Sequence, residues 1–167
     1  FGAATLSLLS FQLDGENAGQ LTLTGGSTIE LEEPSFDPAS TSGLNPTALV
    51  DAPGIGSSGE LLVIGGGVNR AADGAGAHDG VLLVLDRTDL SIIRRLNLGG
   101  SPGAALLAPT QDGHILYLAG PDGIRSIRRN GAGWQPSSVR IEYNPAGTLP
   151  FIADIVRWND TLYAADF

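Results

Sequence analysis

The chain has no cysteine and no methionine, its 9 basic residues are all arginine, and it has only two histidines in 167 residues. The absence of cysteine excludes disulfides, iron–sulfur clusters, zinc–thiolate sites and cysteine nucleophiles. With so few histidines, we expect no transition-metal site. No stretch approaches the roughly 20 consecutive apolar residues of a membrane-spanning helix, so no membrane span is expected.

Positive charge is also scarce: the chain has 9 arginines and 18 acidic residues, which gives a formal net charge of −9. No basic patch is present to displace counterions from nucleic-acid phosphates or to dock on an anionic membrane, so neither partner is expected. The sequence begins at Phe1 rather than at methionine. We interpret it as a mature exported protein, and we expect an extracytoplasmic location (periplasm, cell surface or secreted). A cytosolic fragment is the alternative.

The residues that are abundant favour strands and turns. The chain holds 24 glycines and 10 prolines, and 42% of its residues are hydrophobic. Short segments with period-2 alternation are separated by Gly, Asn-Gly or Asp-Gly, which is typical of antiparallel hairpins. Residues 61–64 and 81–85 are continuously apolar and predict central strands buried on both faces. No window of 11 or more residues has helical apolar spacing free of Gly and Pro, so the predicted class is all-β.

An internal repeat follows the proline positions. Pro46, Pro102 and Pro150 each precede a small or apolar strand, a polar turn and a second apolar strand. Two further strand-like stretches, 81–85 and 90–98, lie between the first two units, and the analogous 123–127 and 138–141 precede the third. One period therefore carries four strands over about 50 residues, the size of a propeller blade.

The middle repeat carries a family resemblance. It reads VLLVLDRTDLSIIRRLNLGGSPGAA from Val81, and it continues to DGHILYLA, which ends at Ala119. This run resembles the YVTN/NHL-type β-propeller repeat, in which a strand ending in Asp begins a turn, Gly-x-x-Pro crosses to the next blade, and Asp-Gly precedes Leu-Tyr-Val-Ala. The resemblance covers 43–167, and it is loose in the outer two units.

The resemblance implies an incomplete β-propeller of about three four-stranded antiparallel blades, with the last blade truncated. Residues 1–42 would form N-terminal strands that lead into the first blade, and 43–167 would form the propeller repeats. Because a ring usually needs roughly 4–8 blades, we expect completion by further blades of a longer polypeptide, by other copies of the chain or by another protein. A β-sandwich is the competing architecture.

Two motifs match catalytic or cofactor signatures in residue type and spacing, but not in the sequence context that the chemistry requires. Residues 54–59 satisfy G-x-G-x-x-G, but a strand follows instead of the helix that would hold a pyrophosphate, so we expect a hairpin loop. Residues 99–103 satisfy G-x-S-x-G, but Pro102 has no N–H to offer an oxyanion. We therefore predict no catalytic residue, no metal and no cofactor.

The candidate binding residues are all in expected loops or outer strands. His78 and Asp79 lie in a Gly-rich loop, where simple solvation is the alternative. Arg128 and Arg129 belong to an arginine-rich stretch that would form an anion- or protein-facing patch, with surface salt bridges as the alternative. Trp134 follows Asn130-Gly131 and is expected to be an exposed contact residue. Trp158, near Ile155, is expected to fill the core.

These observations favour a non-catalytic propeller segment that binds a protein or ligand, or acts structurally, within a larger extracytoplasmic protein or assembly. A fragment of a lactonase- or hydrolase-like propeller enzyme is one alternative, because such enzymes assemble their sites from many blades. The other is a β-rich filament subunit completed by strand donation, with residues 3–13 as the donor.

Overall fold

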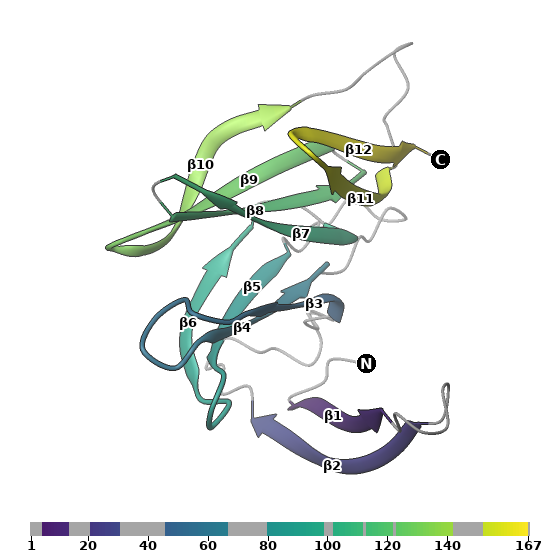
Figure 1. Cartoon of the computed structure of the whole chain (residues 1–167), viewed down its shortest axis with the longest axis vertical. Helices are drawn as coiled ribbons and strands as arrows, with labels where there is room; N and C mark the ends of the chain where they lie inside the picture. Colours follow the sequence, from purple (N-terminus) through teal and green to yellow (C-terminus); the bar gives the residue numbers. More distant parts are fainter. Residues whose placement is uncertain are drawn as a thin grey trace, which may run out of the picture. The chain divides into compact units, whose positions relative to one another are not determined.

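The computed structural model describes residues 5–13, 21–30, 46–66, 80–98, 102–111, 113–121, 123–141 and 152–166. Twelve strands and no helix are present in these ranges, so the all-β prediction is confirmed (Figure 1). Nothing in them forms a helix with the length and apolarity to cross a bilayer. The chain divides into two compact units, Phe1–Gly43 and Leu44–Phe167.

The first unit contains one antiparallel hairpin. Strand β1 (Thr5–Leu13) pairs with β2 (Leu21–Glu30), and the register shifts between Ser10 and Phe11. Such a shift is a β-bulge, which places an extra residue on one strand and increases the local twist. Residues 5–13 are thus paired within their own chain.

The second unit begins with a four-stranded sheet, called here the first sheet. Its strands β3 (Pro46–Ala52), β4 (Glu60–Gly65), β5 (Val81–Asp86) and β6 (Ile92–Asn97) are neighbours in chain order, and all pairs are antiparallel. The central strands β4 and β5 are buried along almost their whole length. This confirms the expectation for the two continuously apolar runs.

The second sheet repeats this arrangement. Strands β7 (Ala104–Thr110), β8 (Gly113–Gly120), β9 (Gly123–Asn130) and β10 (Gly133–Ile141) again pair antiparallel in chain order. The third sheet is the hairpin of β11 (Ile152–Trp158) and β12 (Thr161–Asp166). Pro46 begins β3 and Pro102 shortly precedes β7, whereas Pro150 lies outside the described residues.

Two apolar clusters join the sheets of the second unit. The first contains Leu62, Ile64, Leu82 and Val84 of the first sheet together with Leu116, Leu118, Ile127 and Trp134 of the second. The second contains Ala104, Ala119 and Ile124 of the second sheet with Ile152 and Ile155 of the third. Because side chains alternate between the faces of a strand, the second sheet packs one face against each neighbouring sheet.

The sheets therefore number four, four and two strands within the described residues. The expectation of about three four-stranded units is met in part, because the third sheet has two described strands and the sheets form no closed ring. Burial of the alternating apolar residues, at about 25 cal/mol per Å² of apolar surface, is the main force that holds the stack together.

Candidate functional site

A buried carboxylate lies between the first and second sheets. Glu60, the first residue of β4, is only 4% exposed, and it is the one charged residue buried in the described part of the chain. Its Oε1 accepts a hydrogen bond from Nη2 of Arg129 at 2.9 Å, and its Oε2 accepts one from Nε1 of Trp134 at 2.6 Å. Nε of Arg129 is 3.5 Å from the same Oε2. Both carboxylate oxygens thus have partners from the second sheet, as a buried charge requires.

The strands explain this convergence. Arg129 on β9 and Trp134 on β10 are directly opposite each other in the antiparallel register. Their side chains consequently share a face, the one turned toward the first sheet. The loop between β3 and β4 passes close to the carboxylate: a Cβ added to Gly56, whose φ is +72°, would lie 3.3 Å from Oε1 of Glu60.

The expected environments of the two tryptophans were wrong. Trp134 is 1% exposed and belongs to the core, whereas Trp158 is 66% exposed. The glycine-rich stretch before Trp134 makes only a tight turn, so Trp134 is already inside β10. Trp158 is the last residue of β11, three positions after the buried Ile155. Because side chains alternate between the two faces of a strand, Trp158 shares the outer face with Val156 rather than the inner face with Ile155.

The predicted arginine patch is not assembled as one surface. Arg129 is used by Glu60, Nη1 of Arg125 donates to the Leu98 carbonyl at 2.8 Å, and Nη1 of Arg94 donates to the Ala132 carbonyl at 3.3 Å. These bonds connect the first and second sheets. Arg128 is exposed on β9. The structure brings Arg129 and Trp134 together, but inside the molecule instead of on a contact surface.

The remaining predicted residues are placed as follows. His78 and Asp79 lie outside the described residues. Residues 54–59 form the loop between β3 and β4, with a strand after it, so the hairpin-loop interpretation of G-x-G-x-x-G is confirmed. Within the described ranges, no group of three or more His, Asp or Glu side chains is placed to hold a metal ion.

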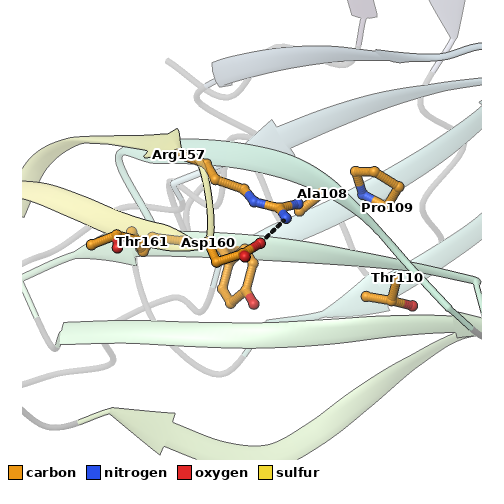
Figure 2. Close-up of a pocket in the computed structure, with 8 residues that line it drawn as sticks. Ala108, Pro109, Thr110, Arg157, Asp160 and Thr161 are labelled. Atoms are coloured by element: carbon orange, nitrogen blue, oxygen red, sulfur yellow. Dashed lines mark hydrogen bonds and ion pairs between the residues drawn. The ribbon is translucent and has the colours of Figure 1, made fainter.

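A groove of about 180 Å³ opens between the second and third sheets, and sequence reasoning did not identify it. The second sheet contributes Tyr117 and the end of β7, and the third sheet contributes the turn of its hairpin (Figure 2). The lining residues are Ala108, Pro109, Thr110, Tyr117, Arg157, Asp160, Thr161 and Leu162. The two walls of the groove come from segments about one repeat apart in the sequence. The repeat is therefore the sequence feature that could have related these segments.

An ion pair borders this groove. Nη2 of Arg157 is 3.2 Å from Oδ1 of Asp160, and Nε of Arg157 donates to the Asn159 carbonyl at 2.7 Å. Asn159 has a φ of +55°, a left-handed conformation that asparagine adopts more readily than most residues. The turn thereby holds the guanidinium in place, while the Asp160 carboxylate stays fully exposed to solvent.

The outer face of the third sheet carries an exposed apolar patch. Val156, Trp158 and Tyr163 are 55%, 66% and 47% exposed, respectively. Val156 and Tyr163 are cross-strand partners, and the rings of Trp158 and Tyr163 contact at 6.2 Å between centroids. Large apolar side chains grouped in this way typically mark an interaction site.

A polar cluster closes one end of the first sheet. Arg87 binds Asp51 through Nε at 2.8 Å and Nη2 at 3.2 Å. Asp86 accepts a hydrogen bond from the Ser58 hydroxyl and another from the Thr88 amide at 2.7 Å. These bonds lower the pKa of Asp86, the Ser58 bond most, and the Asp51 carboxylate raises the pKa of Arg87. The cluster is exposed, and its polar groups bind one another. We therefore assign it a structural role.

Comparison of the chain with models of protein families, with curated proteins and with solved structures finds no match.

Proposed function

We propose that the second unit is a segment of a β-propeller of the YVTN/NHL repeat type, and that it serves as a non-catalytic protein-binding or structural module of a larger extracytoplasmic assembly. The observation that carries the proposal is the stack itself. Two four-stranded sheets in chain order are packed face to face, and a hairpin is packed in the same way on the second sheet.

The register supports one repeated unit. The pairs Val50–Leu62, Leu106–Tyr117 and Val156–Tyr163 join the first and second strands of the three sheets. The first pair faces the second sheet and the second pair faces the third sheet. Val50 and Leu106 each lie four residues after a repeat proline, so the first and second sheets present the same positions toward the next sheet. Val156 lies six residues after Pro150 and, with Tyr163, is on the outward face of the third sheet.

The contacts between sheets support a radial arrangement. The first strands of neighbouring sheets lie close together: β3 contacts β7 and β7 contacts β11, while β11 also contacts β8. The Thr47 hydroxyl of β3 also donates to the Pro102 carbonyl, just before β7, at 3.0 Å. In a propeller the first strands of the blades gather around the central channel.

A binding role is favoured by the exposed face of Val156, Trp158 and Tyr163 and by the groove beneath it. The net charge of −9 and the absence of cysteine are consistent with an extracytoplasmic protein.

No specific observation favours the enzyme alternative. Strand β1 pairs with β2 of its own chain, so residues 5–13 are not presented as a donor strand.

The stack is tested by solution NMR on the whole chain. A repeat stack predicts nuclear Overhauser contacts between the Trp134 indole and the Glu60 side chain, and separately between Ile155 and the Ala104 and Ala119 methyls. A β-sandwich would bring the first and third sheets onto the same face of the second. Contacts of Ile155 with Leu116 or Leu118 would therefore refute the proposal.

The non-catalytic role is tested with the same protein. The purified chain should hydrolyse lactones and esters no faster than buffer does, with or without added Ca²⁺. Saturable turnover that persists after a second purification step would instead establish the enzyme alternative.

A further inference from the structure

We infer that Asn130 is a site of spontaneous covalent modification: it loses its side-chain amide through a cyclic imide with Gly131 and becomes isoaspartate. Water is the co-reactant and ammonia is released. The inference is independent of the proposed repeat family, because it uses only the β9–β10 turn and the contacts of that turn with the first sheet.

The turn between β9 and β10 presents the reacting groups to solvent. Asn130 ends β9, Gly131 and Ala132 form the turn, and all three residues are exposed. Oδ1 of Asn130 accepts a hydrogen bond from the Ala132 amide at 2.9 Å. Asparagine in turns commonly makes this local bond to the backbone two residues further on. The bond closes a small ring that contains both Cγ of Asn130 and the nitrogen of Gly131, so the two atoms that must join are held together.

The first step of the reaction joins these two atoms. The Gly131 nitrogen gives up its proton and attacks Cγ of Asn130, the Cγ–Nδ2 bond breaks, and the side-chain nitrogen leaves as ammonia. Glycine favours this attack because it has no side chain beside the nitrogen. No other atom lies within 4 Å of the place that a Cβ on Gly131 would take, so the rest of the fold does not crowd this position.

The second step opens the cyclic imide with water. Addition of water at Cγ gives aspartate, and the main chain is unchanged. Addition at the backbone carbonyl carbon of Asn130 gives isoaspartate, in which the main chain continues through Cγ and the former backbone carbonyl becomes a free carboxylate.

That backbone carbonyl is part of the joint between the first and second sheets. It accepts a hydrogen bond from Nη1 of Arg129 at 2.8 Å, and the same guanidinium donates to Glu60 through Nη2 at 2.9 Å. In isoaspartate the carboxylate that replaces this carbonyl competes with Glu60 for Arg129, because hydrogen bonds to ionised acceptors are the stronger ones. The modification therefore acts on the buried ion pair.

The two products differ in their effect on the hairpin. Asn130 and Gly133 are opposite each other in the β9–β10 register. Isoaspartate adds one methylene to the main chain between them and so changes the length of a tight turn. Aspartate keeps the main chain, and its carboxylate accepts the same bond from the Ala132 amide. We therefore expect isoaspartate, but not aspartate, to weaken the joint between the sheets.

The modification is measured on the whole folded chain, incubated at pH 8 and 37 °C and compared with an unincubated sample. The chymotryptic peptide 119–134 contains Asn130 as its one asparagine. Its mass should rise by the difference between a hydroxyl and an amino group, and electron-transfer fragmentation should identify isoaspartate. The peptides that carry Asn97 and Asn159 should change at least tenfold more slowly, because each of these residues precedes one with a side chain.

Matched variants test the mechanism. Gly131→Val places a branched side chain beside the attacking nitrogen, in open space, and should slow the mass change at Asn130 at least tenfold. Gly103→Val, at another position where an added Cβ meets no atom, should leave the rate unchanged. Circular dichroism verifies that both variants fold. An unmodified Asn130 in the folded parent chain, or an equal rate in Gly131→Val, would overturn the inference.

The effect on the sheets is tested on the isoaspartyl form, which chromatography separates from the parent by its added negative charge. We expect a lower urea midpoint and a shifted NMR signal of the Trp134 indole N–H, which donates to Glu60 at 2.6 Å. Asn130→Asp reproduces the aspartyl product and should change neither. An isoaspartyl form with the parent's midpoint and Trp134 signal would show that the joint is unaffected and overturn this part of the inference.

Discussion

At the level of single residues, Glu60 is the one charged residue that is buried in the described part of the chain. It has one charged and one neutral donor from the neighbouring sheet, Arg129 and Trp134. Taking a carboxylate out of water is costly, and such a group is stable only when its oxygens are satisfied. Substituting Arg129 or Trp134 should therefore destabilise the fold more than substituting an exposed residue of the same type.

Trp134→Phe should lower the free energy of unfolding by about 2 kcal/mol, because it removes a buried hydrogen-bond donor and leaves a small void. Trp158→Phe is the matched control and should change stability by less than about 0.5 kcal/mol, since Trp158 is on the surface. Urea denaturation at pH 7, followed by circular dichroism, measures both. Equal losses would contradict the opposite environments of the two tryptophans.

Arg129→Met should destabilise the protein by about 3 kcal/mol, because it leaves the buried Glu60 carboxylate without its cation. Arg128→Met, one position along on the exposed side of β9, should be nearly neutral. The double variant Glu60→Leu/Arg129→Met should be more stable than Arg129→Met alone, since no unpaired charge remains. Chemical denaturation of the four proteins distinguishes a structural ion pair from a surface one.

The Asp86 carboxyl should titrate below its ordinary pKa of 3.8, chiefly because the Ser58 hydroxyl binds its ionised form. A lowered pKa stabilises the fold above about pH 3.8, and this contribution is lost as the pH falls through the folded-state value. Ser58→Ala should raise the pKa of Asp86 in an NMR titration of side-chain carboxyls. Ser57→Ala is the control, and an unchanged midpoint in Ser58→Ala would contradict the assignment.

At the level of elements, the loop between β3 and β4 determines how Glu60 enters its strand. Gly54, Gly56 and Gly59 all have positive φ, so the loop uses backbone conformations that other residues rarely adopt. The G-x-G-x-x-G spacing is therefore a requirement of this tight connection, and it needs no phosphate to explain it.

Gly56→Ala should destabilise the protein by about 1–2 kcal/mol, because a Cβ is strained at a left-handed φ and would press on the Glu60 carboxylate. Gly103→Ala, at a position with no atom near the added Cβ, should be neutral within about 0.5 kcal/mol. Thermal and urea unfolding compare the two. A neutral Gly56→Ala would show that the loop can rearrange.

At the level of the whole molecule, stability should decrease from the interior of the stack to its exposed hairpin. Among the described strands, β4, β5 and β8 are buried and paired on both edges, whereas β12 is mostly exposed and pairs with β11 alone. Amide exchange measured by NMR should be at least ~100-fold slower in β4, β5 and β8 than in β12. Comparable protection in β12 would indicate that its edge is already covered in solution.

Much of the secondary structure could be predicted from local sequence. The apolar runs 61–64 and 81–85 identified the central strands, and the lack of helical spacing identified the class. The candidate site was predicted poorly. Trp134 follows four residues typical of a turn, and nothing local indicates that its indole binds a carboxylate in a strand that lies 74 positions earlier.

The sequence by itself determined the strands, their turns and the repeated order of strands along the chain, because alternation and turn chemistry act between near neighbours. Only the tertiary structure decided which face of each sheet is covered. Whether a side chain such as Trp158 is buried depends on the sheet packed above it, and that sheet belongs to a different part of the chain.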